Sequence, residues 1–398
     1  MTLRSIAVVG ASLAGKSAAA ALRRGGFGGH LVVIGEEVHA PYDRPPLSKE
    51  WLRSERTAQL IALREDPVLA DVEWRLGQRA QSLYAPSLSL RVEGRQPEAF
   101  DGIVIATGAR PRRLPGTQLP GVHVLRTLDD ANALRADLIR PAGRVVVVGA
   151  GFIGQEVAAT CRKLGLGVTM IEPAAPASHV VGESVAQLLT DLHCSHGVDV
   201  KLGVSVEAFE GDGRLRLVRL NDGTAVEADV AVVGIGVIPN TEWLVGSGLR
   251  IEDGVVCDET CLAAPGIVAA GDVARWPNAR YGHTRRVEHW DNAVRQGEHA
   301  ALRLLAGDET SASRPYNPLP WFWSDQYGLK LQLVGSTIGH DEARIVAGSA
   351  AAGKFIALYR RGDQLIAALT LANTSKLLKY RRSLESPVSW DDALAMAA

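Results

Sequence analysis

The glycine pattern of a dinucleotide-binding turn occurs twice in this chain, at Gly10–Gly15 and at Gly149–Gly154. Each pattern follows an apolar, β-branched run, Ile6–Val9 in the first case and Val145–Val148 in the second, and each leads into a segment with a helical pattern. Glycine is needed in such a turn because the backbone must approach a pyrophosphate closely and the free N–H groups of the following helix must point at the anion. Two such turns in one polypeptide predict two bound dinucleotides.

Each predicted turn has an acidic residue at the end of the next strand. Glu36 follows Leu31–Ile34, and Glu172 follows Val168–Ile171. A carboxylate at this position accepts hydrogen bonds from ribose hydroxyls. Glu172 would also repel a 2′-phosphate, and residues 173–178 contain no Arg or Lys to hold one. The second site is therefore predicted to prefer NADH over NADPH.

A competing motif overlaps the first turn, since residues 10–17 also spell the GxxxxGKS of a nucleoside-triphosphate loop. In that interpretation Lys16 would reach phosphates and Ser17 a magnesium ion. The dinucleotide interpretation explains the same glycines together with Glu36, and a triphosphate enzyme has no need of the second turn. We therefore expect Lys16 to be a solvated residue in the first turn of a helix.

Length and composition exclude several classes of protein. A chain of 398 residues can hold two to three domains, and its formal net charge of −1 argues against a nucleic-acid partner. No apolar run is long enough to cross a bilayer, and the first predicted strand begins almost at Met1 without room for a secretory signal. We expect a cytoplasmic protein without membrane insertion.

The four cysteines, Cys161, Cys194, Cys257 and Cys261, are too few for a disulfide framework in a chain of this size. Cys257 and Cys261 have three residues between them, and we interpret both as small buried strand residues. No cysteine pair lies near the first turn. Thiol exchange is therefore not the expected acceptor chemistry.

Strand and helix patterns alternate from Met1 to about Val233, which predicts doubly wound parallel sheets with crossover helices. We predict an α/β fold with two Rossmann-like dinucleotide-binding domains in a glutathione-reductase-like arrangement, followed by a C-terminal α+β domain. The last domain is expected to contain an antiparallel sheet and a helix near Ser375–Leu384. The predicted boundaries are 1–108 with 236–313 for the first domain, 109–235 for the second and 314–398 for the third.

Six segments, taken in order, match one known family: Gly10–Gly15, Pro41–Lys49, Ala106–Arg110, Gly149–Glu156, Gly271–Asp272 and Trp321–Gln326. They resemble the FAD-dependent NADH:ferredoxin reductases of the putidaredoxin reductase type, which serve aromatic-ring dioxygenases and bacterial haem monooxygenases. The resemblance covers nearly the whole chain, and its most specific parts are the Arg-Pro-Pro-Leu-Ser-Lys and Trp-Ser-Asp-Gln segments. Ser12 departs from the family pattern because it replaces the middle glycine of the first turn.

The resemblance implies FAD at the first turn and NADH at the second, with no metal. It implies that Lys49 lies against the flavin near N5 and that Glu156 pairs with this lysine close to the nicotinamide, as the two catalytic residues. The other FAD-binding residues that it implies are Gly10, Ser12, Ala14, Gly15, Glu36, Arg44, Ala80, Thr107, Gly108, Arg126, Asp272 and Trp290. The corresponding NADH-binding residues are Gly149, Gly151, Ile153, Gly154, Glu172 and Gly236.

The resemblance also implies that a hydride passes from NADH to FAD and that single electrons then pass to a [2Fe–2S] ferredoxin. Because such ferredoxins are acidic, docking is expected to use positive charge and to weaken with salt. Trp321 and Trp323 match aromatic residues near the exposed flavin edge, where the partner would dock. The candidate docking cations are Arg285, Arg286, Arg295, Lys330, Lys376, Lys379, Arg381 and Arg382. For the last four, a solvated helix face is the favoured interpretation.

Two other functions share this scaffold. One is an FAD- and NADH-dependent oxidoreductase that acts on oxygen or a small molecule, and the other is a non-enzymatic redox-sensing relative of apoptosis-inducing factor. The intact Lys49 and Glu156 pair argues against the second. The sequence leaves open which ferredoxin, oxygenase and pathway are served, and whether the protein is a monomer or a homodimer.

Overall fold

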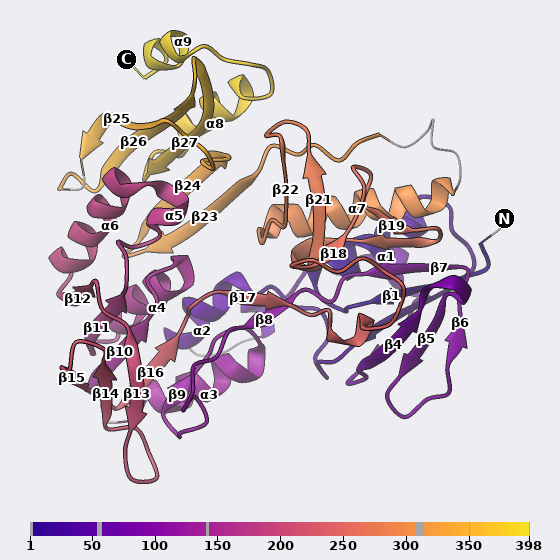
Figure 1. The fold of residues 1–398 in the computed structure, drawn as a ribbon, viewed down its shortest axis with the longest axis horizontal. Coiled ribbons are helices and arrows are strands. Elements are labelled where there is room, and N and C mark those ends of the chain that lie inside the picture. The colour runs from indigo at the N-terminus through magenta and orange to yellow at the C-terminus, as the bar shows by residue number, and fades with distance from the viewer. Residues whose placement is uncertain (1–2, 54–57, 141–142, 308–313, 350, 398) are drawn as a thin grey trace. The chain divides into compact units, whose positions relative to one another are not determined.

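The computed structural model describes residues 3–53, 58–140, 143–307, 314–349 and 351–397. The chain forms two compact units (Figure 1). Unit 1 comprises Met1–Asp43, Ala62–Arg110 and Ile238–Pro320, and unit 2 comprises Arg44–Ile61, Pro111–Val237 and Trp321–Ala398. Each unit is therefore assembled from segments that lie far apart in the sequence.

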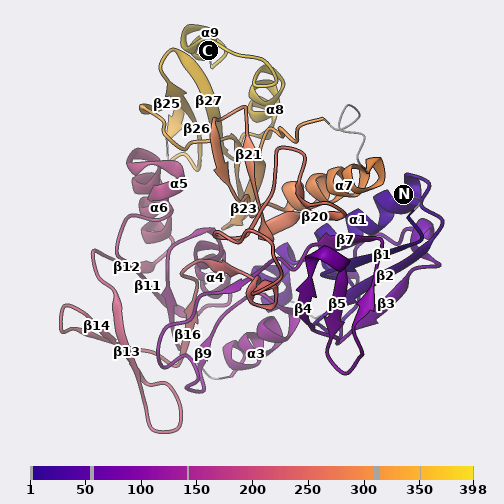
Figure 2. The ribbon, with the colours of Figure 1, turned by 45° about the vertical axis from the view of Figure 1, so that its right-hand side comes forward.

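The main sheet of unit 1 has six strands in the order β19 (Leu262–Ala264), β20 (Ile267–Ala269), β7 (Gly102–Ile105), β1 (Ser5–Val9), β2 (His30–Gly35) and β3 (Glu73–Leu76). Neighbouring strands pair in parallel, except for the antiparallel pair β19 and β20. The central strands are almost entirely buried, as expected for a parallel sheet that is covered on both faces. Helices α1 (Leu13–Arg24) and α7 (Trp290–Ala306) contact each other beside this sheet (Figure 2).

Two three-stranded sheets complete unit 1. One contains β4 (Ala80–Tyr84), β5 (Ser89–Val92) and β6 (Glu98–Ala99), and the other contains β18 (Val255–Val256), β21 (Ala274–Asn278) and β22 (His283–Arg285). Short 3₁₀ turns lie at Pro67–Leu69, Ala85–Ser87, Glu242–Leu244 and Gly271–Val273. The short strands β8 (Ala109–Pro111) and β17 (Val237–Pro239) lie where the chain passes from one unit to the other.

Unit 2 contains a second parallel sheet, in the order β12 (Val198–Leu202), β11 (Gly167–Glu172), β10 (Arg144–Val148), β16 (Val230–Val233) and β9 (Val122–His123). Its helices are α3 (Leu128–Leu138), α4 (Phe152–Lys163), α5 (Ser178–Val181) and α6 (Glu183–Ser195). An antiparallel sheet follows, formed by β13 (Val206–Glu210), β14 (Leu217–Leu220) and β15 (Ala225–Glu227). The 3₁₀ turn η1 (Pro45–Ser48) and helix α2 (Glu50–Arg53) also belong to unit 2, together with a 3₁₀ turn at Ala58–Leu60.

The C-terminal part of unit 2 is a five-stranded antiparallel sheet in the order β23 (Trp321–Gln326), β24 (Leu329–Gly335), β27 (Gln364–Leu371), β26 (Lys354–Arg361) and β25 (Glu342–Ser349). Helices α8 (Thr374–Ser383) and α9 (Trp390–Ala395) follow it. Buried residues of α6 and of the sheet, such as Leu189 and Leu369, belong to one hydrophobic core. The Tyr359 hydroxyl donates to the backbone oxygen of Val181 at 2.8 Å, which fixes the sheet to α5.

The α/β fold class predicted from the sequence is confirmed. Strands form at all four predicted runs that flank the two glycine turns, and they pair in parallel. The C-terminal sheet is antiparallel, and α8 lies where a helix was predicted. The three domain boundaries stay a prediction. In the part of the chain that the structure describes, no helix is long and apolar enough to span a membrane.

Candidate functional site

The first glycine turn joins β1 to α1 in unit 1. Gly10 has a φ of +119°, and a Cβ atom there would lie 2.1 Å from the backbone oxygen of Ala106. A Cβ atom on Gly15 would lie 1.8 Å from the backbone oxygen of Gly10. Both glycines are therefore required by the packing of the turn itself. Ser12 is the N-cap residue of α1, whose first turn contains no acidic residue that would repel an anion.

The structure brings two further predicted residues to this turn. A Cβ atom on Gly271 would lie 2.9 Å from the Cβ of Ala14, so the Gly271–Asp272 segment lies beside the start of α1. The Gly271 N–H group donates to the buried side chain of Gln296 at 2.9 Å. Ala14 and Asp272 therefore lie close together, although they are far apart in the sequence.

Thr107 and Gly108 are held in place by Asn240. The Thr107 hydroxyl donates to the backbone oxygen of Asn240, and the Asn240 side-chain amide donates to the backbone oxygen of Thr107, both at 2.9 Å. The Asn240 N–H group donates to the Gly108 oxygen at 2.9 Å. Asn240 was not predicted from the sequence, because its role depends on long-range contacts and no local pattern marks it.

The other predicted residues of unit 1 lie at the ends of secondary-structure elements. Glu36 follows β2, is largely exposed, and lies 3.7 Å from the guanidinium of Arg79. Ala80 follows Arg79 in the sequence and begins β4. Trp290 begins α7, and its indole N–H donates to the carboxylate of Asp43 at 2.7 Å.

Lys16 differs from the sequence expectation. It is half-buried rather than solvated, and its Nζ donates to the backbone oxygen of Arg64 at 2.7 Å. Burial lowers the pKa of Lys16, and the carboxylates of Asp66 and Glu65 partly offset this shift. The ammonium group is thus engaged within unit 1, and these contacts are consistent with the dinucleotide interpretation of the first turn.

The second glycine turn joins β10 to α4 in unit 2 and repeats the geometry of the first. Gly149 has a φ of +96°, and a Cβ atom on Gly154 would lie 2.0 Å from the backbone oxygen of Gly149. Gly151 differs from these two glycines, because a Cβ atom there would meet nothing within 4 Å. The carboxylate of Glu172 accepts a hydrogen bond from the Ala150 N–H group at 2.7 Å. The predicted ribose-binding carboxylate is therefore anchored to the turn.

The remaining predicted residues of the second site lie near this turn. Ile153 is in the first turn of α4 and is 49% exposed, which is unusual for a large apolar side chain. A Cβ atom on Gly149 would lie 3.3 Å from the side chain of Ile235, next to Gly236. Gly236 has a φ of +91° and accepts a hydrogen bond from the Arg112 N–H group at 2.9 Å.

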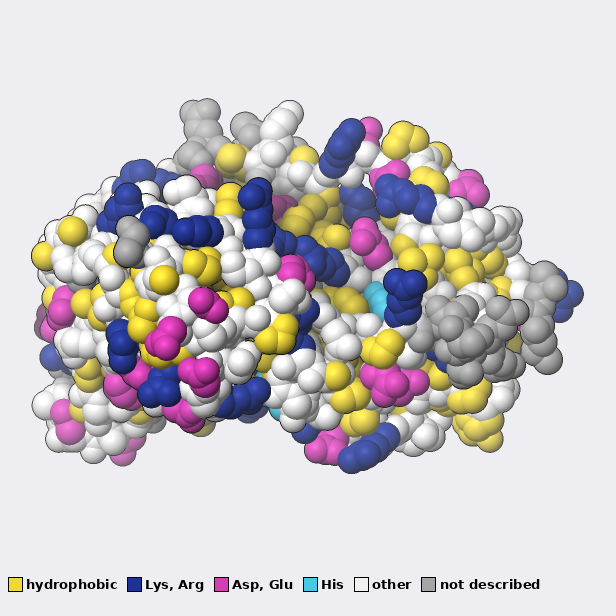
Figure 3. Space-filling view, turned by 90° about the horizontal axis from the view of Figure 1, so that it is seen from above, with side chains coloured by type: hydrophobic (Ala, Val, Ile, Leu, Met, Phe, Trp, Pro, Cys, Tyr) yellow, Lys and Arg dark blue, Asp and Glu magenta, His cyan; other side chains and the backbone are white. Residues whose placement is uncertain are grey.

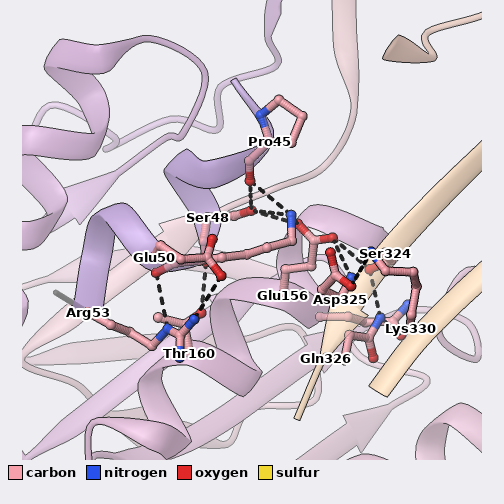
Figure 4. Close-up of polar contacts among 12 residues, drawn as sticks. Pro45, Ser48, Glu50, Arg53, Glu156, Thr160, Ser324, Asp325, Gln326 and Lys330 are labelled. Carbon is pink, nitrogen blue, oxygen red and sulfur yellow. Dashed lines mark hydrogen bonds and ion pairs between the residues drawn. The ribbon is translucent and has the colours of Figure 1, made fainter. Parts of the chain in front are cut away.

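Lys49 and Glu156 form a buried ion pair within unit 2 (Figure 4). The distance from Lys49 Nζ to Glu156 Oε2 is 2.7 Å, and the two side chains are 9% and 3% exposed. Lys49 Nζ also donates to the backbone oxygen of Pro45 at 2.9 Å and to Ser48 Oγ at 3.3 Å. The pairing of Lys49 with Glu156, which the family resemblance implied, is thus present in the structure.

The carboxylate of Glu156 accepts hydrogen bonds from two other segments of unit 2, around Ser48 and around Ser324. Its Oε2 accepts from the hydroxyl of Ser48 at 2.6 Å in addition to Lys49. Its Oε1 accepts from the hydroxyl of Ser324 at 2.8 Å and from the N–H group of Asp325 at 3.2 Å. Ser48 and Ser324 were not predicted as site residues from the sequence, although each lies in one of the two segments that are most specific to the family. Their position in those segments was the available signal.

Arg44 and Arg126, which were both predicted to bind FAD, also meet in unit 2. Arg44 Nη1 donates to the backbone oxygen of Arg126 at 2.6 Å. The Arg126 N–H group donates to Asp130 at 3.1 Å, just before α3. The start of the Arg-Pro-Pro-Leu-Ser-Lys segment is therefore held by the loop that precedes α3.

Trp321 and Trp323 stack on one face of β23, with ring centroids 5.1 Å apart. A cation lies over each ring: Lys330 Nζ is 5.8 Å from the centroid of Trp323, and Arg381 Cζ is 5.5 Å from that of Trp321. Both indoles are only half-buried, unlike their neighbour Phe322. The pair forms a partly exposed surface of aromatic and positively charged groups.

The candidate docking cations are not equally available. Arg286 is 9% exposed and forms ion pairs with Asp253 and Glu288, so its suggested docking role is wrong. Arg285 is half-buried, and burial lowers its pKa. Arg295 pairs with Asp291 at 3.0 Å, and Lys330 pairs with Asp325 at 2.7 Å, but both cations keep more than 40% of their side-chain surface exposed (41% and 45%).

The cysteines are free thiols. Cys161, Cys257 and Cys261 are buried, and Cys194 is exposed. Burial raises the pKa of Cys261 to about 12 and that of Cys257 well above its ordinary value. A thiol must lose its proton to act as a nucleophile, so this pair is poorly suited to thiol exchange.

Comparison with known proteins agrees with this geometry. Residues 4–297 match the family described as pyridine nucleotide-disulphide oxidoreductase, and residues 321–398 match the reductase C-terminal family. The chain belongs to the pyridine nucleotide-disulphide oxidoreductases. The resemblance to redoxin reductases that the sequence indicated is confirmed by the relatives described next.

Among curated oxidoreductases, the chain is 37% identical to rhodocoxin reductase of Rhodococcus erythropolis, over 98% of this chain and 92% of that protein. It is 39% identical to the ferredoxin–NAD(+) reductase component of the p-cumate 2,3-dioxygenase system of Pseudomonas putida, over 96% of this chain and 92% of that protein. Its fold is similar to a chain in the crystal structure of the covalent putidaredoxin reductase–putidaredoxin complex, with a TM-score of 0.91, 32% identity, and coverage of 98% of this chain and 95% of that chain.

The two turns fit the cofactors of this family, FAD and NAD(H). The first and last glycines of each glycine turn allow the backbone to close tightly. The first helical turns of α1 and α4 contain no acidic residue that would repel an anion. The free N–H groups at these helix N-termini suit a pyrophosphate. The open space beside Gly151 leaves room for one at the second turn.

A substitution tests the first turn. We expect Gly15→Ala to reduce FAD affinity by about tenfold or more, which corresponds to ~1.4 kcal/mol, because the added Cβ would lie 1.8 Å from the Gly10 oxygen. Flavin absorbance per protein after gel filtration measures the loss. Gly28→Ala is the matched control, since a Cβ there meets nothing within 4 Å. Full flavin retention by Gly15→Ala would contradict the assignment.

Proposed function

We propose that this protein is an FAD-dependent NADH:ferredoxin oxidoreductase that feeds an oxygenase. Its relatives named above are reductases of redoxin and dioxygenase systems, and they match nearly the whole chain. The electron acceptor is a [2Fe–2S] ferredoxin, and we place the protein in the cytoplasm. When bound, FAD accepts a hydride and releases it as two single electrons and a proton, which is the chemistry that connects NADH to a one-electron carrier.

The observation that carries this proposal is the buried Lys49–Glu156 pair. Its partners Ser48 and Ser324 come from the two segments that are most specific to the redoxin reductases. Such an arrangement holds one positive charge in a fixed place inside a dry environment, where it acts more strongly than in water. We assign Lys49 the role of presenting this charge to the reduced flavin, and Glu156 the role of orienting Lys49.

Binding of NADH is assigned to the second turn. The glycines there close the backbone, and Glu172 is anchored to Ala150 in a position to accept hydrogen bonds from a ribose. Ile153 presents an exposed apolar side chain in the first turn of α4, where it can pack against the dinucleotide. The FAD-binding roles of the unit 1 residues, and of Arg44 and Arg126, are part of the same proposal.

Docking of the ferredoxin is assigned to Trp321 and Trp323 with Lys330, whose ammonium lies over the ring of Trp323. Arg295 of unit 1 stays a further docking candidate. Figure 3 shows Lys and Arg side chains gathered along the upper part of the left half of the view, with Asp and Glu side chains mostly below them. We assign most of the docking energy to a few groups at the centre of the contact, as is usual at protein interfaces. Indole rings with cations above them offer both apolar contact and positive charge to an acidic partner.

Cytochrome c reduction by NADH, measured with and without an added [2Fe–2S] ferredoxin, tests the proposed function. We expect flavin reduction by NADH and a large stimulation by the ferredoxin. If NADH reduces the flavin and the ferredoxin has no effect while oxygen or a small molecule is consumed quickly, the acceptor assignment is wrong. Slow reduction with a long-lived charge-transfer complex would favour a redox-sensing role instead.

The role of Lys49 predicts the behaviour of Lys49→Met. We expect flavin reduction by saturating NADH to slow by roughly 10²-fold, the typical effect of removing one preorganised charged or hydrogen-bonding group. The variant should also lose about 3 kcal/mol of stability, because Glu156 stays buried without its partner. Anaerobic stopped-flow absorbance measures the rate. The control is Lys354→Met, at an exposed strand end, which should reduce its flavin at the wild-type rate. A flavin-reduction rate of Lys49→Met within about twofold of wild type would refute the role assigned to Lys49.

The role of Glu172 predicts a change in nucleotide preference. The double variant Glu172→Ser with Ala174→Arg should raise the NADPH-to-NADH ratio of kcat/KM by about tenfold or more, or ~1.4 kcal/mol, because it removes a repelling carboxylate and adds a phosphate-binding cation. Ala174 is exposed, so the arginine has room. Ala174→Arg alone is the control and should change the ratio little while Glu172 remains. An unchanged NADPH-to-NADH ratio in the double variant would refute the assignment of Glu172 to ribose binding.

A further inference from the structure

A buried polar cluster in unit 2 is joined to Glu156 by the hydrogen bond from Ser324. It contains His193 of α6, Gln155 of α4, and Ser324 and Gln326 of β23. These four side chains are at most 1% exposed, and Glu156 itself is 3% exposed. Buried polar groups of this kind are costly unless they are hydrogen-bonded to one another. Neither the family pattern nor the proposed chemistry accounts for a histidine at this place.

The hydrogen bonds between His193 and Glu156 have a defined direction. Gln155 Nε2 donates to the backbone oxygen of Ala150 at 2.9 Å, which leaves Gln155 Oε1 as the acceptor. Gln326 Nε2 donates to Gln155 Oε1 and to Ser324 Oγ, both at 3.1 Å. The Ser324 hydroxyl therefore has to donate onward, to Glu156 Oε1 at 2.8 Å. Figure 4 shows Ser324 and Gln326 beside Glu156.

His193 completes this chain at its far end. Its Nε2 lies 3.4 Å from Gln155 Oε1, and because that oxygen can only accept, Nε2 must carry the proton. Nδ1 is then an acceptor, and it lies 2.6 Å from the hydroxyl of Tyr327. Burial, followed by the charge of His196, lowers the pKa of His193 to about 4, and Gln326 partly offsets the shift. The ring is neutral at pH 7, as this pattern of one donor and one acceptor requires.

The chain is suited to holding groups in place rather than to moving protons. Two donors, from His193 and Gln326, converge on Gln155 Oε1, and an amide between them does not pass a proton readily. What the arrangement does fix is the rotamer of each member. Gln155 is also bonded to Ala150 of the second turn, so the chain connects that turn to the carboxylate of Glu156.

We propose that His193 is a positioning residue: by donating to Gln155 it fixes Gln326 and Ser324 so that Ser324 donates to Glu156 and keeps this carboxylate directed at Lys49. The proposal rests on the function proposed above for Lys49 and Glu156. His193 does not touch the reacting groups, and its effect is transmitted through Gln155, Gln326 and Ser324.

Two substitutions at His193 separate its two hydrogen bonds. A glutamine amide can occupy the position of the histidine Nε2, so His193→Gln keeps the donor to Gln155 and loses the acceptor for Tyr327. An asparagine amide can occupy the position of Nδ1, so His193→Asn keeps the Tyr327 contact and loses the donor to Gln155. Tyr327→Phe removes the Tyr327 contact alone. Thr190→Val removes a buried hydroxyl of α6 that donates to the backbone oxygen of Ala186 in the same helix.

The measurement is the rate of flavin reduction at saturating NADH, together with the NADH concentration for half-maximal rate and the melting temperature. We expect His193→Asn to slow flavin reduction about tenfold with a half-saturating NADH concentration within about twofold of wild type. His193→Gln, Tyr327→Phe and Thr190→Val should keep rates within about twofold of wild type. If His193→Asn does not fold, Gln326→Leu breaks the same chain nearer to Glu156 and should show the same loss.

Two results would overturn the proposal. One is a wild-type rate in His193→Asn or Gln326→Leu. The other is an equal loss of the flavin-reduction rate in His193→Asn and His193→Gln, in proportion to the fall in their melting temperatures. A purely structural role of His193 predicts that result. Failure of the wild-type protein to reduce its flavin with NADH is a different outcome, since it refutes the proposed function itself.

Discussion

The buried ion pair between Lys49 and Glu156 is the interaction on which unit 2 depends most. Two charges removed from water are favourable only when their remaining hydrogen-bonding capacity is satisfied. Here the carboxylate receives donors from Ser48, Lys49, Ser324 and the Asp325 backbone. Those donors come from the proline-stiffened turn η1 with the Lys49 that follows it, and from β23, while Glu156 lies on α4. The charge pair therefore ties three distant parts of the sequence together.

The C-terminal sheet supplies two of the hydrogen bonds that the buried Glu156 carboxylate needs. Ser324 and Asp325 lie on β23 and bond directly to Glu156. The same sheet shares a hydrophobic core with α6, which carries His193. A change in the packing of the sheet would consequently reach the Lys49–Glu156 pair. The indoles of Trp321 and Trp323 lie on the same strand, so the proposed docking surface and the charge pair are supported by one element.

The sequence predicted the two glycine turns well because their geometry is local. A strand, a turn that only glycine can make, and a helix N-terminus all lie within about fifteen residues, and the structure shows the tight approaches at Gly15 and Gly154. Ser324 was not assigned, although its place in the Trp-Ser-Asp-Gln segment was a signal. Asn240 and His193 could not be assigned, because each acts through partners far away in the sequence. The suggestion of Arg286 as a docking cation was wrong for the same reason: its partner Asp253 is brought to it only by the fold.

A double-mutant cycle on Lys49 and Glu156 tests the central claim most directly. The rate of flavin reduction by saturating NADH is measured for wild type, Lys49→Met, Glu156→Gln and the double variant. If the two residues act as one unit, the double variant should lose little more than Lys49→Met alone, since the second substitution removes a partner that is already lost. Losses that simply multiply would show that the two side chains act independently and would contradict the account.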